Sequence, residues 1–111
     1  MIYELRTYEA VTGKMPALHK RFAETTLALF ARHGIKVVGF WTSDIGGASN
    51  ELVYMLAYAS LADREQRWAA FAADPEWQQK RAESERDGPL VARVTNSILR
   101  PTPYSPATAA T

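Results

Sequence analysis

The stretch ELVYMLAYASLADREQRWAAFAADPEW, residues 51–77, decides the fold of this chain. Residues 51–59 alternate as a strand does, and one face carries Leu52, Tyr54, Leu56 and Tyr58. The opposite face is also largely apolar. A sheet with one face in water would show a cleaner alternation of apolar and polar residues, so we expect both faces to be covered.

The helical segment that follows carries its own start and stop signals. Ser60 is followed three residues later by Asp63, which is the pattern of a capping box. Asp74 can end this helix and cap the next, because its carboxylate can accept free backbone N–H groups. Pro75 suits the first position of the next helix, where its missing N–H costs nothing. The sequence therefore predicts a bend at residues 74 and 75 and a second helix that ends near residue 86.

The flanking segments complete a recognisable order. Hydrophobic periodicity and turn residues predict a helix at 15–33 and further strands at 2–9, 35–43 and 90–100. The order strand, helix, strand, strand, helix, strand is the ferredoxin-like βαββαβ motif, an α+β fold with a four-stranded antiparallel sheet. We expect one domain over residues 1–100, followed by an extended proline-rich tail over residues 101–111.

The helices of this motif cover only one face of the sheet. We expect the uncovered face to carry Trp41 or Phe40 together with Tyr54, Leu56 and Tyr58, which is too apolar a set to lie in water. An exposed patch of that kind indicates a partner. Two sheets packed face to face would give a symmetric homodimer, a dimeric α+β barrel.

Composition excludes several classes of protein. The 111 residues include 13 Lys plus Arg and 12 Asp plus Glu, so the net charge of +1 gives no electrostatic reason to expect a nucleic acid or an anionic membrane as partner. The chain has no cysteine, which excludes disulfides and thiolate metal sites. Its apolar runs are far shorter than the ~18 residues of a membrane helix. Because the first residues read as a strand and not as a signal peptide, we expect a cytoplasmic protein.

Glu4, Arg6 and Tyr8 share one face of the first predicted strand. Arg6 could hold a small anion or a carbonyl group, with Tyr8 as a second donor. The same pattern is typical of a structural Glu4–Arg6 ion pair beside a packed tyrosine, because buried charges need partners. That structural interpretation is the more frequent one.

His19 and His33 both fall on the apolar arc of the first predicted helix. Either could act as a general base in a cavity between helix and sheet. The alternatives are a helix-end histidine stabilised by the helix dipole for His33, and a boundary residue for His19. The two are 14 residues apart, which is ~21 Å along a helix axis, so we expect no metal site.

The sequence also predicts an aromatic-rich interior. Six residues make up this interior and could form the floor of a pocket for a flat apolar ligand: Trp41, Tyr54, Tyr58, Trp68, Phe71 and Trp77. Such residues more often form only a hydrophobic core. No nucleophile elbow, phosphate loop or RNA-binding aromatic motif is present, and we expect no cofactor.

Four pieces of sequence, in order, resemble the NIPSNAP family across residues 2–106: ELRTYE (4–9), ELVYMLAYASL (51–61), FAADPEW (71–77) and ILRPTPYSP (98–106). The resemblance implies a dimeric α+β barrel, related in fold to small antibiotic-biosynthesis-type monooxygenases and to stress-responsive barrel proteins. It implies no activity, because the family as a whole has no agreed biochemical function.

Two functions follow as expectations. The first is a homodimeric protein that binds a small apolar or aromatic ligand in a cleft, or that serves as an interaction protein. The second is a cofactor-independent, monooxygenase- or isomerase-like enzyme for such a molecule. In the enzyme, His33 or His19 would take a proton while Arg6 and Tyr8 stabilise an oxyanion. The sequence leaves open whether the chain is an enzyme, and the position of the two histidines relative to a cavity separates the alternatives.

Overall fold

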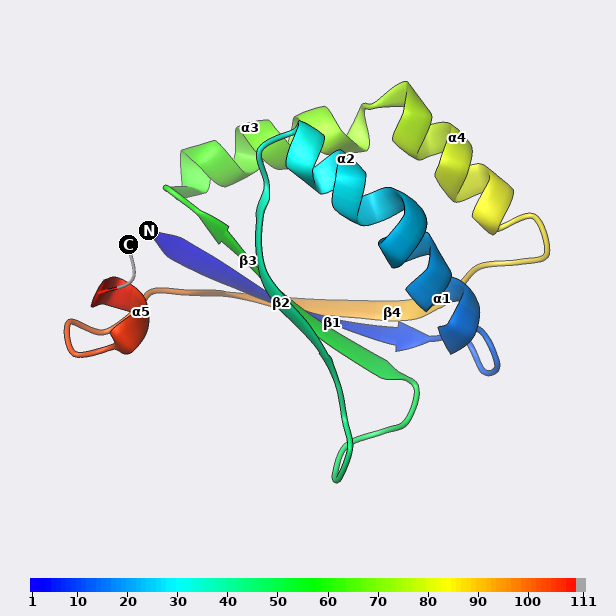
Figure 1. Cartoon of the computed structure of the whole chain (residues 1–111), viewed down its shortest axis with the longest axis horizontal. Coiled ribbons are helices and arrows are strands. Elements are labelled where there is room, and N and C mark those ends of the chain that lie inside the picture. The colour runs from blue at the N-terminus through cyan, green and yellow to red at the C-terminus, as the bar shows by residue number, and fades with distance from the viewer. Residues whose placement is uncertain (110–111) are drawn as a thin grey trace.

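Four strands form one antiparallel sheet in the order β2-β3-β1-β4 in the computed structural model, which describes residues 1–109. The strands are β1 (Ile2–Ala10), β2 (Lys36–Thr42), β3 (Glu51–Tyr58) and β4 (Val91–Leu99). The first helix joins β1 to β2 and consists of α1 (Met15–Arg21), η1 (Phe22–Thr26) and α2 (Leu27–Arg32). Two helices join β3 to β4, namely α3 (Leu61–Ala72) and α4 (Pro75–Ser84). The predicted ferredoxin-like βαββαβ fold is confirmed (Figure 1).

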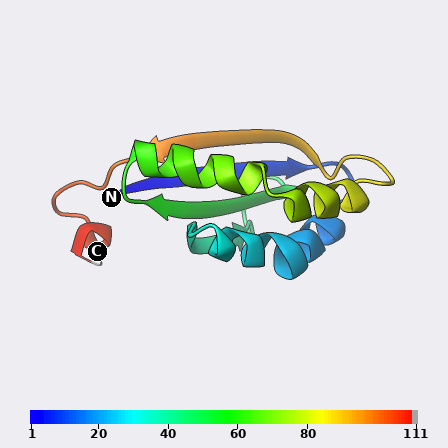
Figure 2. The same cartoon turned by 90° about the horizontal axis from the view of Figure 1, so that it is seen from above.

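The first helix, α3 and α4 all lie on one face of the sheet (Figure 1). Seen from above, the first helix forms one row across the sheet, and α3 followed by α4 forms a second row beside it (Figure 2). The core fills the space between these rows and the sheet, where its largest fully buried side chains include Ile2, Leu18, Leu29, Phe30, Tyr54, Leu56 and Tyr58. Both rows of helices therefore roof the same sheet face.

One expectation about the sheet faces is wrong. Tyr54, Leu56 and Tyr58 point towards the helices and are buried, as is their neighbour Leu52. Alternation shows which residues of a strand share a face, but it does not show which face the helices cover when both are apolar. Phe40 also turns inward, where its ring stacks on Tyr54 with the centroids 4.8 Å apart.

The sheet face without helices carries a different apolar set. Leu5 pairs with Met55, and Met55 pairs with Gly39 on the other side, so these residues share that face. Trp41 pairs with Val53 in the same way. We call this surface the helix-free face, and its half-buried or exposed apolar members are Tyr3, Leu5, Trp41, Val53, Met55 and Leu99.

Both predicted helix caps are present. The Ser60 hydroxyl accepts a hydrogen bond from the backbone N–H of Asp63 at 3.1 Å, and the Asp63 carboxylate accepts one from the N–H of Ala59 at 3.0 Å. Asp74 accepts the N–H of Glu76 at 2.9 Å and starts α4. The bend at residues 74 and 75 is confirmed, and α4 ends at residue 84, close to the predicted position.

The periodicity of residues 15–33 predicted a regular α-helix, but the first helix is not uniform. Its middle segment, η1, is a π-helix, in which the N–H of Leu27 bonds to the carbonyl of Phe22 five residues earlier. The Thr26 hydroxyl donates to the carbonyl of Arg21 at 3.3 Å within the same wide turn. The helix stops before Gly34, which has the positive φ of 71° that ends helices.

Beyond β4 the chain turns back towards the start of β1. The segment predicted as an extended tail contains a short helix, α5 (Pro106–Ala109), which lies near the N-terminus (Figure 1). The Tyr3 hydroxyl donates a hydrogen bond of 3.3 Å to the carbonyl of Ala107. Residues 110–111 of the predicted tail lie outside the described residues. Within residues 1–109, no helix is both long enough and apolar enough to cross a membrane.

Candidate functional site

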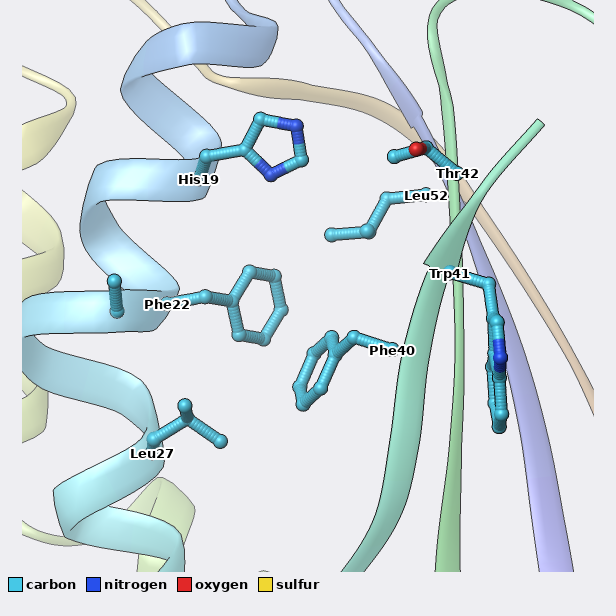
Figure 3. Close-up of a pocket in the computed structure, with 8 residues that line it drawn as sticks. His19, Phe22, Leu27, Phe40, Trp41, Thr42 and Leu52 are labelled. Atoms are coloured by element: carbon cyan, nitrogen blue, oxygen red, sulfur yellow. The ribbon is translucent and has the colours of Figure 1, made fainter. Parts of the chain in front are cut away.

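Two hollows lie beside the first helix. The inner cavity, of 260 Å³, is enclosed by the first helix, by α3 and α4, and by β1 and β4 of the sheet. The outer pocket, of 340 Å³, lies on the other side of the first helix, against β2 and β3 (Figure 3). Phe22, from the π-helical turn, lines both hollows and separates them.

Glu4 is the polar centre beneath the inner cavity. It is completely buried, and its carboxylate accepts hydrogen bonds from Arg6 at 3.0 Å, from Arg64 at 2.9 and 3.0 Å, and from Asn96 at 2.8 Å. Burial alone would raise the pKa of Glu4. The hydrogen bonds from Arg64 and Asn96 and the charge of Arg6 outweigh burial and hold the pKa below its ordinary value of 4.5. Glu4 is therefore a stable anion that anchors Arg6 and does not line the cavity itself.

Arg6 and Tyr8 form the polar floor of the inner cavity. Arg6 Nε donates to the Tyr54 hydroxyl at 2.7 Å, and Arg6 Nη2 donates to the Tyr8 hydroxyl at 3.3 Å. The Tyr54 hydroxyl in turn donates to that of Tyr8 at 2.9 Å. Burial raises the pKa of Tyr54 well above its ordinary value, so this hydroxyl stays protonated. The floor is a connected and rigid array of donors.

Aromatic rings form the walls of the inner cavity. The guanidinium carbon of Arg6 lies 4.4 Å from the ring centre of Trp68, a favourable cation–π distance. Phe71 packs against Trp68 and Trp77, with centroid distances of 5.3 and 4.8 Å. Such a lining suits a flat or apolar body, and the floor beneath it suits an oxygen acceptor.

The other predicted ligand-binding residues lie away from this cavity. Tyr58 is buried without lining either hollow, and burial together with the nearby charge of Glu4 raises the pKa of Tyr58 to about 12. Tyr54 supports the floor from below. Trp41 is one of the residues of the outer pocket, although its ring points to the other side of β2 from Phe40 (Figure 3). Gly39 makes room for this indole, because a Cβ there would meet the ring at 2.8 Å.

Neither histidine lines the inner cavity. His19 is exposed on the first helix and faces Thr42 and Leu52 across the outer pocket (Figure 3). His33 lies at the end of α2, where its Nε2 contacts Oδ2 of Asp74 at 2.7 Å. Neither residue proposed as a general base therefore faces the floor formed by Arg6 and Tyr8. His19 faces the outer pocket, and His33 is bound to Asp74, the residue that caps α4.

Sequence reasoning missed three polar residues that line the inner cavity, namely Arg21 of α1, Thr26 of η1 and Arg81 of α4. Trp77 of α4, which was predicted to belong to the aromatic interior, lines the cavity as well. Arg21 follows the core residue Leu18 by three positions, a spacing that places both on one helix face. That spacing was the available signal for Arg21, and the four-residue spacing from Trp77 was the available signal for Arg81. Among residues 1–109, no three acidic or histidine side chains are arranged to hold a metal ion.

Fold and site together define a small ferredoxin-like α+β protein with a roofed, arginine-floored cavity under its helices. The NIPSNAP family model matches residues 3–106. The chain belongs to the NIPSNAP family.

Proteins of known sequence or structure agree with this assignment. Human protein NipSnap homolog 3A is 31% identical over 80 residues, which are 72% of this chain and 32% of that protein. The chain spans about a third of the length of the curated relatives it matches. Protein Atu4242 of Agrobacterium tumefaciens is 36% identical with a TM-score of 0.83, covering 96% of this chain and 98% of that one. An uncharacterized NIPSNAP domain protein of Burkholderia xenovorans has 27% identity, the same TM-score, and coverages of 96% and 99%.

Proposed function

We propose that this NIPSNAP protein is a homodimeric binding protein for a small aromatic or apolar molecule, which occupies the inner cavity. The observation that carries the proposal is the placement of Arg6, whose guanidinium is held by Glu4, Tyr8 and Tyr54 directly beneath Trp68. A charged group fixed this firmly in an aromatic-walled hollow can orient a ligand without rearranging.

The size of the cavity limits the ligand. Its 260 Å³ lies just below the range of about 300–1,000 Å³ usual for ligand sites, so a single-ring molecule is the expected size. Exposed Val94 and Arg81, on β4 and α4, mark the open side through which such a molecule enters.

The homodimer is supported by the helix-free face. Its half-buried apolar side chains include Leu5 and Met55 in the middle of the sheet, and the first helix, α3 and α4 all lie on the opposite face. At one end of the helix-free face, the Tyr3 hydroxyl bonds to Ala107 of α5. Monomeric proteins rarely leave a contiguous apolar surface of this kind in water. A second copy of the same face is self-complementary by symmetry, which supports face-to-face pairing. The cytoplasm as compartment belongs to the same proposal, and the cysteine-free sequence is compatible with it.

Binding is favoured over catalysis by the positions of the histidines. An enzyme working in the inner cavity needs a base within hydrogen-bond reach of the substrate. His33 is engaged by Asp74, and His19 faces the outer pocket instead.

The test is a thermal-shift and calorimetric screen of single-ring molecules, neutral and charged, including phenylacetamide and phenylacetate. We expect at least one to raise the melting temperature and to bind in a Trp68-dependent way. Trp68→Leu should weaken that binding at least about tenfold, because it removes the aromatic wall above Arg6. Tyr104→Leu is the matched control, since Tyr104 is exposed and lines neither hollow, and this variant should bind as the wild type does. Binding that is equally strong in Trp68→Leu, or no binding by any compound, overturns the proposal.

A further inference from the structure

The charged side chains that line the inner cavity are all positive. Three arginines line it, namely Arg6, Arg21 and Arg81, and no aspartate or glutamate is among its lining residues in the described part of the chain. The anion nearest Arg6 is Glu4, which lies beneath the floor and already accepts hydrogen bonds from Arg6 and Arg64. A hollow with cationic walls and no lining acid is suited to an anionic occupant.

Arg21 supplies the second observation. Its side chain is only 7% exposed, and its Nε is buried with no hydrogen-bond partner among the described residues. Nη1 is engaged, with Ser84 Oγ at 3.2 Å and Glu85 Oε1 at 3.6 Å. Burial lowers the pKa of Arg21 below its ordinary value, which shows that the surroundings do not fully replace water around this charge. A buried donor without an acceptor is destabilising, so an acceptor is missing at this point.

The local charge count gives the charge of that acceptor. Glu85 lies 3.6 Å from Arg21 and 3.5 Å from Arg81, so one carboxylate is shared by two guanidinium groups. One positive charge remains unbalanced on this side of the cavity. A single negative charge on a ligand would neutralise it, and a charged acceptor forms the stronger kind of hydrogen bond with the Arg21 guanidinium.

We propose that the ligand of the inner cavity is a small organic acid, whose carboxylate accepts hydrogen bonds from Arg21 and whose aromatic or branched apolar body lies against Trp68 and Trp77. This inference rests on the proposed function, because it names the chemical class of the molecule that the same cavity binds. The aromatic walls argue against a bare inorganic anion, since six of the lining residues are Tyr8, Phe22, Phe30, Trp68, Phe71 and Trp77.

The experiment compares two probes of nearly identical shape. Phenylacetate carries the charge, phenylacetamide does not, and inorganic phosphate tests the charge without an apolar body. Isothermal calorimetry with the full chain should show phenylacetate binding at least about tenfold more tightly than phenylacetamide, and phosphate binding more weakly than phenylacetate. If both ring compounds bind equally, the acid inference fails while the binding function stands. If phosphate binds as tightly as phenylacetate, the apolar body is irrelevant and the inference also fails. If none of the three binds, this acid class is overturned, and only the failure of the wider screen would overturn the binding function as well.

Variants of Arg21 test whether this residue holds the charge. Arg21→Met should abolish the preference for phenylacetate over phenylacetamide. It should leave the melting temperature of the ligand-free protein equal to or above that of the wild type, because it removes a buried charge while Glu85 keeps Arg81 as its partner. Arg21→Gln, which shortens the side chain and keeps a polar amide without the charge, should lose the preference too. Arg86→Met is the matched control, since Arg86 is exposed at the end of α4 and does not line the cavity. A preference that survives in both Arg21 variants overturns the proposal.

Discussion

Asp74 connects the end of the first helix to the start of α4. One of its oxygens accepts the N–H of Glu76 and caps α4. The other accepts from Arg32 at 3.1 Å and contacts His33 at 2.7 Å, so the end of the first helix is tied to the junction of α3 and α4. The Asp-Pro break therefore serves as a joint between the two rows of helices that roof the inner cavity.

The charge of Asp74 predicts a pH dependence of stability. The hydrogen bond with His33 is the main cause that lowers the pKa of Asp74 from 3.8 to about 2. Because the pKa is lower in the folded protein, the stabilisation is complete above the ordinary pKa and is lost as the pH falls through the folded one. Asp74→Asn keeps a capping side chain but removes the charge. We expect the variant to be less stable than the wild type at pH 7, with most of the difference lost by pH 2, as measured by urea unfolding across that range. A stability difference that does not change with pH contradicts this account.

At the scale of the element, the π-helical turn of the first helix shapes both hollows. Five residues, Phe22–Thr26, occupy a turn that an α-helix would make with fewer, so one residue is extra relative to the regular ladder. Phe22 lines both hollows, and the inner cavity is also lined by Arg21, just before the turn, and by Thr26, its last residue. The wide turn thus occurs where the first helix contributes most to the candidate site.

A deletion tests this view of the turn. Removing Ala23, which is exposed, should convert the π-helix to an α-helix and leave α1 and α2 in place, so the melting temperature should fall by less than about 5 °C. Removing the equally exposed Ala70 from α3 should lower the melting temperature by more than about 15 °C. Each α-helical residue turns the chain by about 100°, so this deletion would rotate one part of α3 away from the face that it buries. Scanning calorimetry of the two variants gives the comparison. Equal decreases in melting temperature would mean that η1 contains no extra residue relative to a regular α-helix.

The elements differ in how well the sequence predicts them. Caps depend on a few neighbouring residues, so Ser60 and Asp74 were recognisable, and the alternation of β1 placed Glu4, Arg6 and Tyr8 on one face. The π-helical turn and the inward turn of Arg21 were not predicted, because they depend on what α4 and the sheet offer to the first helix in three dimensions. The prediction of which face of β3 the helices cover was wrong for a related reason, since two apolar faces cannot be told apart from the sequence.

At the scale of the whole molecule, the helix-free face is the surface through which we propose that two copies pair. Met55 lies between Leu5 on β1 and Gly39 on β2, in the middle of this surface. Met55→Asp would place a charge at the centre of the proposed dimer interface, where it has no partner and must be desolvated. We expect the wild type to be a dimer and this variant a monomer by size-exclusion chromatography with light scattering. Leu61→Asp, on the exposed start of α3, is the matched control and should stay dimeric. A monomeric wild type at micromolar concentration removes the interface altogether.

The bulge in β2 has a consequence for behaviour at high protein concentration. This strand is one border of the sheet, and its register shifts between Val37 and Gly39, which leaves Val38 out of the ladder. An irregular border is a poor template for adding another strand side by side, which is how open-ended fibres grow. Face-to-face pairing of two sheets stops at a dimer, whereas the addition of strands along a regular sheet edge can continue without limit. The bulge at Val38 should therefore make this border of the sheet a poor site for the addition of further strands.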